Sequence, residues 1–205
     1  MRGSHGSATR LGTFLVAVGV AVGIGCSAPQ VSAARTAVTT FSPFAGDGTL
    51  RGGLRATPEY GGSCASGSFI VSGADVFRCF AGNAIRDPCY VDDLAGNNDR
   101  SVVVCVATPW DRAVVRLRIS GDLDSAFGAR SNAPPWALRL NSGTRCVFLE
   151  GATTVVRGRR LNYGCGNGRW LIGSPDRKRP TWRIQQVRSP TDSAPRRVSV
   201  AAAYF

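Results

Sequence analysis

The stretch WALRLNSGTRCVFLE, residues 136–150, indicates most directly which kind of fold the chain adopts. Trp136, Leu138 and Leu140 alternate with smaller or charged residues, which is the period of two expected for a strand with one buried face. The NSGT that follows favours a hairpin turn, so the residues after it are expected to pair back as a second strand. This stretch therefore predicts an antiparallel β-hairpin.

Similar patterns recur along the chain. Residues 101–106 form a continuous β-branched run typical of a buried strand, and residues 113–119 end in apolar–arginine alternation. Residues 74–80 fit either a short helix or a strand, and residues 86–90 are expected to form a turn or loop around a proline. Further strands are expected at residues 153–157, 160–163, 169–172, 182–185 and 198–201.

The cysteines predict a disulfide framework. The chain has seven of them, and Cys26 lies in the N-terminal segment. An even number of cysteines in an exported chain favours three disulfides, and fifteen pairings of six cysteines are possible. Pairing between sequence neighbours is favoured, whereas a zinc site would need closer cysteine pairs, often with histidine. The six are Cys64, Cys79, Cys89, Cys105, Cys146 and Cys165.

These signals together predict the fold class. We expect a mainly β protein, a disulfide-stapled small antiparallel β-barrel or sandwich with a loop-rich N-terminal part. Residues 34–61 are rich in small and polar residues and are expected to form a flexible tether. Residues 62–205 are then expected to form a single disulfide-bonded, β-rich domain.

The first 33 residues are expected to direct export. Arginines precede an uncharged apolar run at residues 11–25, which has the length of a signal-peptide core. Two processing sites remain open: Cys26 as the lipidated residue of a lipobox, or a small-x-small site at residues 31–33. No later apolar stretch is long enough to span a bilayer. The protein is thus expected outside the cytoplasm, either secreted or lipid-anchored to the membrane.

Histidine is almost absent, and this excludes several chemistries. The single histidine, His5, lies within the export segment. Catalytic triads and cysteine–histidine mechanisms therefore lose their general base, and histidine-ligated zinc is excluded. No glycine motif for a nucleotide is present, so no cofactor and no metal are expected.

Carboxylate pairs remain as candidates for catalysis, because glycoside hydrolysis needs two acidic side chains. The simpler interpretation is that they cap backbone amides in turns. The candidates are Asp87, Asp92, Asp93, Asp122, Asp124 and Glu150.

The positive charge is concentrated near the C-terminus. Residues 27–140 carry 11 basic and 10 acidic side chains, whereas residues 141–205 carry 12 basic and 3 acidic ones. Outside the cell, an anionic cell-wall polymer or a membrane surface is the expected partner, and nucleic acid is not. A generally solvated surface is the simpler interpretation of any single arginine. The residues proposed to bind are Arg157, Arg159, Arg160, Arg169, Arg177, Lys178, Arg179 and Arg183.

Several short motifs carry a resemblance to a known group of proteins. They include GSC at residues 62–64, NAIRDPCY at 83–90, GTRC at 143–146, LNYGC at 161–165 and PTWRI at 180–184. Together they resemble a small six-cysteine domain of actinobacterial secreted proteins and lipoproteins. The resemblance implies export, three disulfides and a role in the cell envelope, and it implies no catalytic residue.

The sequence leaves three functions open. The preferred one is a non-enzymatic cell-envelope protein that binds an anionic envelope component through a basic C-terminal face. The alternatives are a carboxylate-dependent glycan hydrolase and an extracellular protein-interaction module. The oligomeric state remains open.

Overall fold

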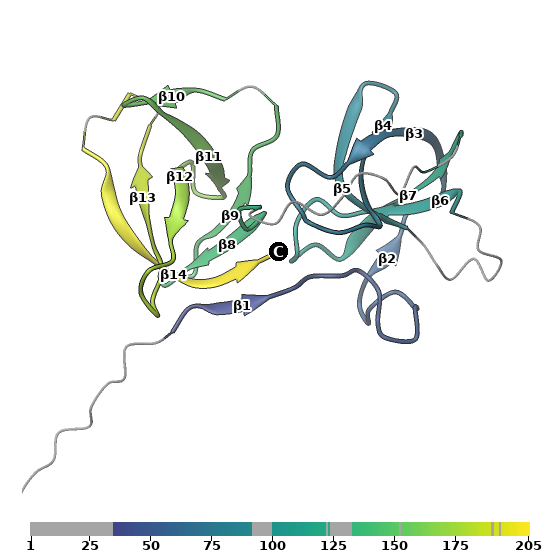
Figure 1. Cartoon of the computed structure of the whole chain (residues 1–205), viewed down its shortest axis with the longest axis horizontal. Helices are drawn as coiled ribbons and strands as arrows, with labels where there is room; N and C mark the ends of the chain where they lie inside the picture. The colour runs from purple at the N-terminus through teal and green to yellow at the C-terminus, as the bar shows by residue number, and fades with distance from the viewer. Residues whose placement is uncertain are drawn as a thin grey trace, which may run out of the picture. The chain divides into compact units, whose positions relative to one another are not determined.

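The computed structural model describes residues 35–91, 100–121, 123, 133–151, 153–189, 191–192 and 194–205 (Figure 1). Within these residues every regular element is a β-strand, and the strands form two sheets. Residues 1–34, which include His5, Cys26 and the predicted export segment, lie outside the described residues.

The first sheet closes on itself into a small barrel, because β6 (Val102–Cys105) and β7 (Ala113–Ile119) pair with each other as well as with their neighbours. Strand β3 (Tyr60–Gly67) pairs in parallel with β7. Together with β4 (Val76–Ala81) and β5 (Ala84–Val91), these strands also form four antiparallel pairs: β3–β4, β4–β5, β5–β6 and β6–β7. Phe77, Val103 and Leu117 fill its interior. In sheet order the strands are β2 (Arg55–Ala56), β7 (Ala113–Ile119), β3 (Tyr60–Gly67), β4 (Val76–Ala81), β5 (Ala84–Val91) and β6 (Val102–Cys105).

The second sheet closes through pairing of β14 (Arg196–Tyr204) with β8 (Ala137–Leu140). Leu138, Tyr163 and Leu171 are fully buried inside it. Its strands are β1 (Ala37–Thr39), β14 (Arg196–Tyr204), β13 (Arg183–Val187), β12 (Trp170–Asp176), β11 (Arg159–Cys165), β9 (Arg145–Phe148) and β8 (Ala137–Leu140), with β10 (Val155–Val156) paired to β11.

Three disulfides join cysteines that face each other on neighbouring antiparallel strands. The two cysteines of each pair are direct partners in the strand register, and their Cα atoms are 3.9–4.1 Å apart. The bridges are the neighbouring pairs favoured by sequence order: Cys64–Cys79, Cys89–Cys105 and Cys146–Cys165.

A third buried cluster takes residues from both sheets. Val104 and Val114 of the first sheet and Ala137 of the second belong to it, together with Trp136. Phe41, which follows β1, packs edge-on against Trp136 with ring centroids 5.5 Å apart. The stretch 35–61, expected from composition to be a tether, thus contains β1, β2 and the start of β3, and it contributes to the core.

The predicted fold class is confirmed as all-β and disulfide-stapled, with two small barrels in place of one. Residues 74–80 lie mostly in β4, and residues 86–90, expected to be a turn or loop, lie within β5. Three disulfides indicate an oxidising, extracytoplasmic environment. The described part of the chain contains no helix long and apolar enough to cross a bilayer.

Candidate anion-binding surface

The eight basic residues predicted to bind an anion all lie on the second sheet or its connections. Their contacts divide them into separate groups rather than one continuous face. By position, they lie in the β10–β11 turn (Arg157), at the start of β11 (Arg159 and Arg160), before β12 (Arg169), between β12 and β13 (Arg177, Lys178 and Arg179) and at the start of β13 (Arg183).

Two neighbouring glutamines of β13 organise one group. The Oε1 atom of Gln186, a residue only 3% exposed, accepts hydrogen bonds from Nε and Nη2 of Arg196 at 3.0 and 2.8 Å. The same oxygen accepts a longer bond from Nη1 of Arg169 at 3.5 Å, and Gln185 accepts one from Arg159 at 3.2 Å. We call these five residues the glutamine–arginine cluster. Neutral amide oxygens orient its three guanidinium groups and leave their positive charge uncompensated.

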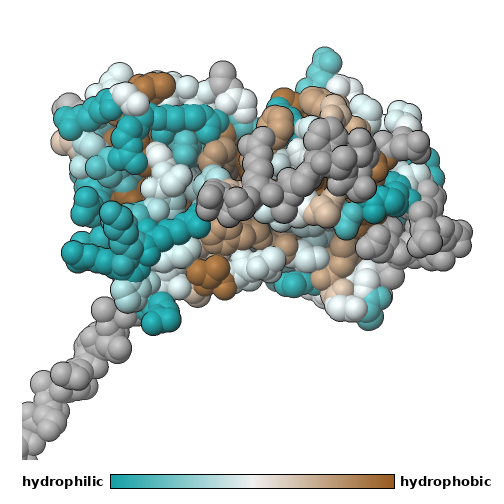
Figure 2. All heavy atoms as spheres, viewed as in Figure 1, coloured by the Kyte–Doolittle hydropathy of each residue, from teal (hydrophilic) through white to brown (hydrophobic). Residues whose placement is uncertain are grey.

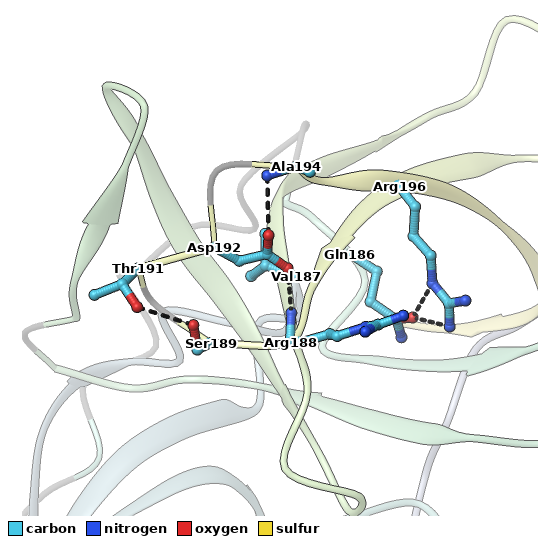
Figure 3. A pocket seen from close by; sticks show the side chains of 8 residues that line it. All are labelled: Gln186, Val187, Arg188, Ser189, Thr191, Asp192, Ala194 and Arg196. Carbon is cyan, nitrogen blue, oxygen red and sulfur yellow. Dashed lines mark hydrogen bonds between the residues drawn. The ribbon is translucent and has the colours of Figure 1, made fainter.

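A hollow of about 630 Å³ lies beside this cluster (Figure 3). Arg188 and Arg196 line it, and the hydroxyl groups of Ser189 and Thr191 are 3.0 Å apart at its wall. Guanidinium and hydroxyl groups are the donors that phosphate and carboxylate oxygens accept from. The hollow therefore offers hydrogen-bond donors next to the positive charge of the cluster.

One carboxylate shares this hollow. Asp192 accepts backbone hydrogen bonds from Arg188 at 3.0 Å and from Ala194 at 2.9 Å, and these bonds lower the pKa of its carboxyl group. Because both oxygens accept main-chain bonds, Asp192 stays ionised and fixes the shape of the loop. Its charge offsets one of the arginines that line the hollow.

A second group surrounds Arg177. Its guanidinium lies over the rings of Trp182 and Phe205, at 5.0 and 4.9 Å from their centroids. Lys178 and Arg179 follow directly and are exposed. Stacking on aromatic rings orients an arginine without neutralising it.

Arg160 has a structural role instead. Its Nη2 atom donates to the backbone carbonyls of Leu149 and Gly151 at 2.7 and 3.0 Å, and its guanidinium lies 5.1 Å from the centroid of the Phe148 ring. Arg160 therefore holds the main chain on both sides of Glu150, and fewer of its N–H groups remain for a ligand.

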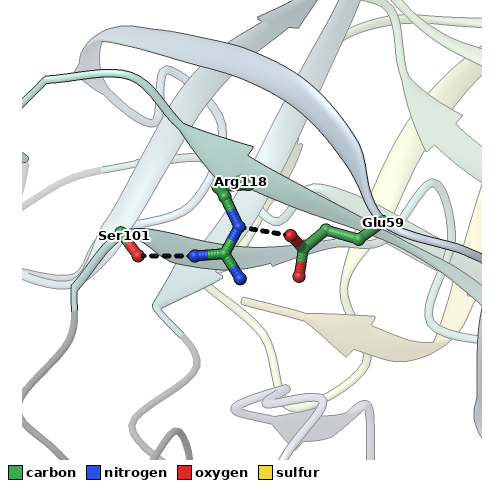
Figure 4. A network of polar contacts seen from close by, with 3 residues as sticks. All are labelled: Glu59, Ser101 and Arg118. Carbon is green, nitrogen blue, oxygen red and sulfur yellow. Dashed lines mark hydrogen bonds and ion pairs between the residues drawn. The ribbon is translucent and has the colours of Figure 1, made fainter.

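Ion pairs distinguish the two sheets. In the first, Arg100 pairs with Asp75 at 2.7 Å and Arg118 with Glu59 at 2.5 Å (Figure 4). Among the described residues, no carboxylate lies within ion-pair distance of the glutamine–arginine cluster or of Arg177. Hydrophilic residues also cover much of the second sheet in the view of Figure 2. Described carboxylates thus form no ion pair with the arginines of the glutamine–arginine cluster or with Arg177, although Asp192 offsets part of the charge beside the hollow.

The structure brings together two of the six candidate carboxylates. Asp87 and Glu150 line one cavity, whereas Asp92, Asp93, Asp122 and Asp124 lie outside the described residues. Burial and, to a smaller extent, the charge of Asp87 raise the pKa of Glu150 to about 7, against the opposing charges of Arg78 and Arg86. Asp87 is 5% exposed and accepts hydrogen bonds from Ser68 and from the backbone of Phe69.

Sequence reasoning missed the glutamines and Arg196. Gln185 and Gln186 are neutral, so a search for basic residues does not select them, although they orient three arginines. The available signal was two consecutive glutamines on a strand whose neighbouring strand begins with two arginines. Their register, with Gln186 opposite Arg196, becomes visible only in the fold.

No protein-family model matches the chain, and no curated protein or solved structure matches it either. The resemblance to an actinobacterial envelope domain therefore stays a prediction.

Proposed function

We propose that this protein is a non-enzymatic cell-envelope protein that binds an anionic envelope polymer through the second sheet. The observation that carries the proposal is the glutamine–arginine cluster, in which neutral acceptors orient three arginines and no described carboxylate pairs with them. Orienting a guanidinium before binding reduces the entropy lost when an anion arrives. Export with or without a lipid anchor at Cys26 belongs to the same proposal.

A polymer suits this surface better than a single small anion. The cluster, the hollow beside it and Arg177 offer several separate positive groups on one sheet. Each exposed charge contact contributes only about 0.2–1 kcal/mol, so useful affinity needs several contacts along a repeating anion. Phosphorylated glycans and acidic wall polysaccharides provide such repeats.

Co-sedimentation of the mature chain with purified cell wall tests the proposal. The triple variant Arg159→Gln, Arg169→Gln, Arg196→Gln is expected to bind about tenfold more weakly or worse, because three oriented charges are lost. A matched control removes three exposed arginines outside the cluster: Arg51→Gln, Arg55→Gln, Arg112→Gln. The control has the same net charge, so a purely global charge effect would weaken both variants equally.

Salt provides a second test. At an ionic strength of about 1 M the Debye length falls to about 3 Å, so binding through exposed charges is expected to be lost. Retention of the parent protein at that salt concentration contradicts the electrostatic proposal, as does equal binding by the parent and the triple variant.

A further inference from the structure

A cavity of about 230 Å³ lies beside β5 and shares no residue with the glutamine–arginine cluster. Arg86 and Asp87 of β5 form its polar wall together with Glu150, which lies two residues after β9. The remaining wall is mostly apolar and includes Val106 and Val115. A mostly apolar cavity with a few polar groups on one side is the usual form of a small-ligand site.

Two polar groups of this wall have no hydrogen-bond partner within the described part of the chain. The Nε atom of Arg86 is buried without an acceptor. The carboxyl group of Glu150 forms no hydrogen bond or ion pair with a described residue. Buried polar groups in folded proteins are nearly always hydrogen-bonded, so the buried orphan donor of Arg86, next to the half-buried carboxyl group of Glu150 on the same cavity wall, points to an occupant.

Arg86 and Glu150 do not satisfy each other. The charge of Arg86 is close enough to lower the pKa of Glu150, yet no ion pair joins the two side chains. Asp87 is bonded elsewhere, to Ser68 at 2.5 Å and to the backbone N–H of Phe69 at 2.9 Å. The occupant must therefore accept a hydrogen bond from Arg86 and also bond to Glu150.

We infer that this cavity binds one uncharged sugar ring, with adjacent hydroxyl groups between Arg86 and Glu150. A hydroxyl group both donates and accepts, so one hydroxyl accepts from the guanidinium while its neighbour bonds to the carboxyl group. The apolar wall formed by Val106 and Val115 suits the C–H face of such a ring.

Charge and size favour a neutral, small occupant. Arg78 and Arg86 oppose the negative charges of Asp87 and Glu150, so the surroundings of the cavity carry both signs and select neither a cation nor an anion. The volume is below the roughly 300–1,000 Å³ that holds drug-sized ligands, which favours a single ring over an oligosaccharide. This inference does not depend on the basic surface, because the two sites share no residue.

Titration of the mature chain with methyl glycosides of mannose, galactose and glucose, followed by NMR, tests the inference. At least one glycoside is expected to bind saturably with a Kd on the order of 1 mM. The variants Arg86→Ala and Glu150→Ala are expected to weaken this binding at least tenfold. The control Glu59→Gln changes a glutamate that pairs with Arg118 outside the cavity, and it is expected to bind like the parent.

Because a truncation can disturb the fold, Glu150→Gln serves as a second variant of nearly equal shape. It is expected to fold like the parent and to bind the glycoside several-fold more weakly, because one carboxyl oxygen is replaced by an amide. The inference is overturned if no glycoside binds, if a folded Glu150→Gln variant and Arg86→Ala both bind like the parent, or if acetate or methylammonium competes for the cavity at equal concentration.

Discussion

At the scale of single residues, Glu150 makes stability depend on pH. Burial, followed by the charge of Asp87, raises its pKa from 4.5 to about 7, against the opposing charges of Arg78 and Arg86. Between these two values the folded protein holds a proton that the unfolded chain has released. The folded state therefore loses stability as pH rises from about 4.5 to about 7.

Glu150→Gln is expected to remove this dependence. The variant should match the parent near pH 4.5 and exceed its stability at pH 8 by on the order of 1 kcal/mol, a figure reduced from the full shift because the side chain is only half-buried. Urea unfolding at both pH values measures the difference. A variant less stable than the parent at pH 8 contradicts the expectation.

Arg157 has backbone strain at an exposed turn. Its φ is 52°, and Gly158 follows with a φ of 71°, a pair of positive values typical of a type I′ hairpin turn between β10 and β11. Asparagine tolerates this conformation better than arginine does. Arg157→Asn is therefore expected to stabilise the fold by about 0.5 kcal/mol while weakening binding to cell wall.

Thermal unfolding and co-sedimentation of the same Arg157→Asn sample separate the two effects. A loss of stability would show that the contacts of the arginine side chain outweigh the strain of its backbone. Unchanged wall binding would remove Arg157 from the proposed surface.

At the scale of elements, cross-strand disulfides reinforce short hairpins. The Cys146–Cys165 bridge spans 19 residues and joins β9 to β11. A loop of that length contributes about 3 kcal/mol by restricting the unfolded chain. The double variant Cys146→Ala, Cys165→Ala is expected to lose about this much stability in urea. Equal stability of the variant and the oxidised parent would contradict this expectation. As a control, the difference in stability between parent and variant should shrink when the disulfides of the parent are reduced.

Local antiparallel pairing was predictable because both strands of a hairpin are close together in the sequence. Strand β5 was not predictable, because Pro88 indicated a loop. The register between β4 and β5 shifts between Phe77 and Cys79. At this irregularity one residue of β4, Arg78, faces two of β5, Asp87 and Pro88, so the proline itself lies in the bulge. Proline has no N–H to donate, and a bulge is where a strand tolerates it. The carbonyl of Pro88 still accepts a bond from Val106.

The candidate site was predictable in charge but not in arrangement. The surplus of arginine identified the C-terminal region, whereas the register of β13 with β14 decides which arginines meet. Only that register brings the guanidinium group of Arg196 within hydrogen-bond distance of the Gln186 side chain. Stacking also depends on distant residues: Arg177 contacts Phe205, 28 positions later in the chain.

At the scale of the whole molecule, pairing between distant segments explains what composition could not reveal. Strand β1 pairs in parallel with β14 at the other end of the chain. Thr36 likewise donates to the carbonyl of Val200 at 2.7 Å, across 164 positions. A segment rich in small residues has no local period that indicates such a partner, because its order depends on non-local contacts.

The cluster around Trp136 is expected to make the two sheets unfold together. It buries Val104 and Val114 of the first sheet with Ala137 of the second.

Trp136 itself is fully buried, so Trp136→Ala is expected to cost about 3–5 kcal/mol. Calorimetry of the parent is expected to show one transition whose calorimetric and van't Hoff enthalpies agree, because neither sheet keeps this cluster alone. In Trp136→Ala the transition should move to lower temperature and broaden, as the sheets begin to unfold separately. Two resolved transitions in the parent would show that each sheet is stable without the shared cluster.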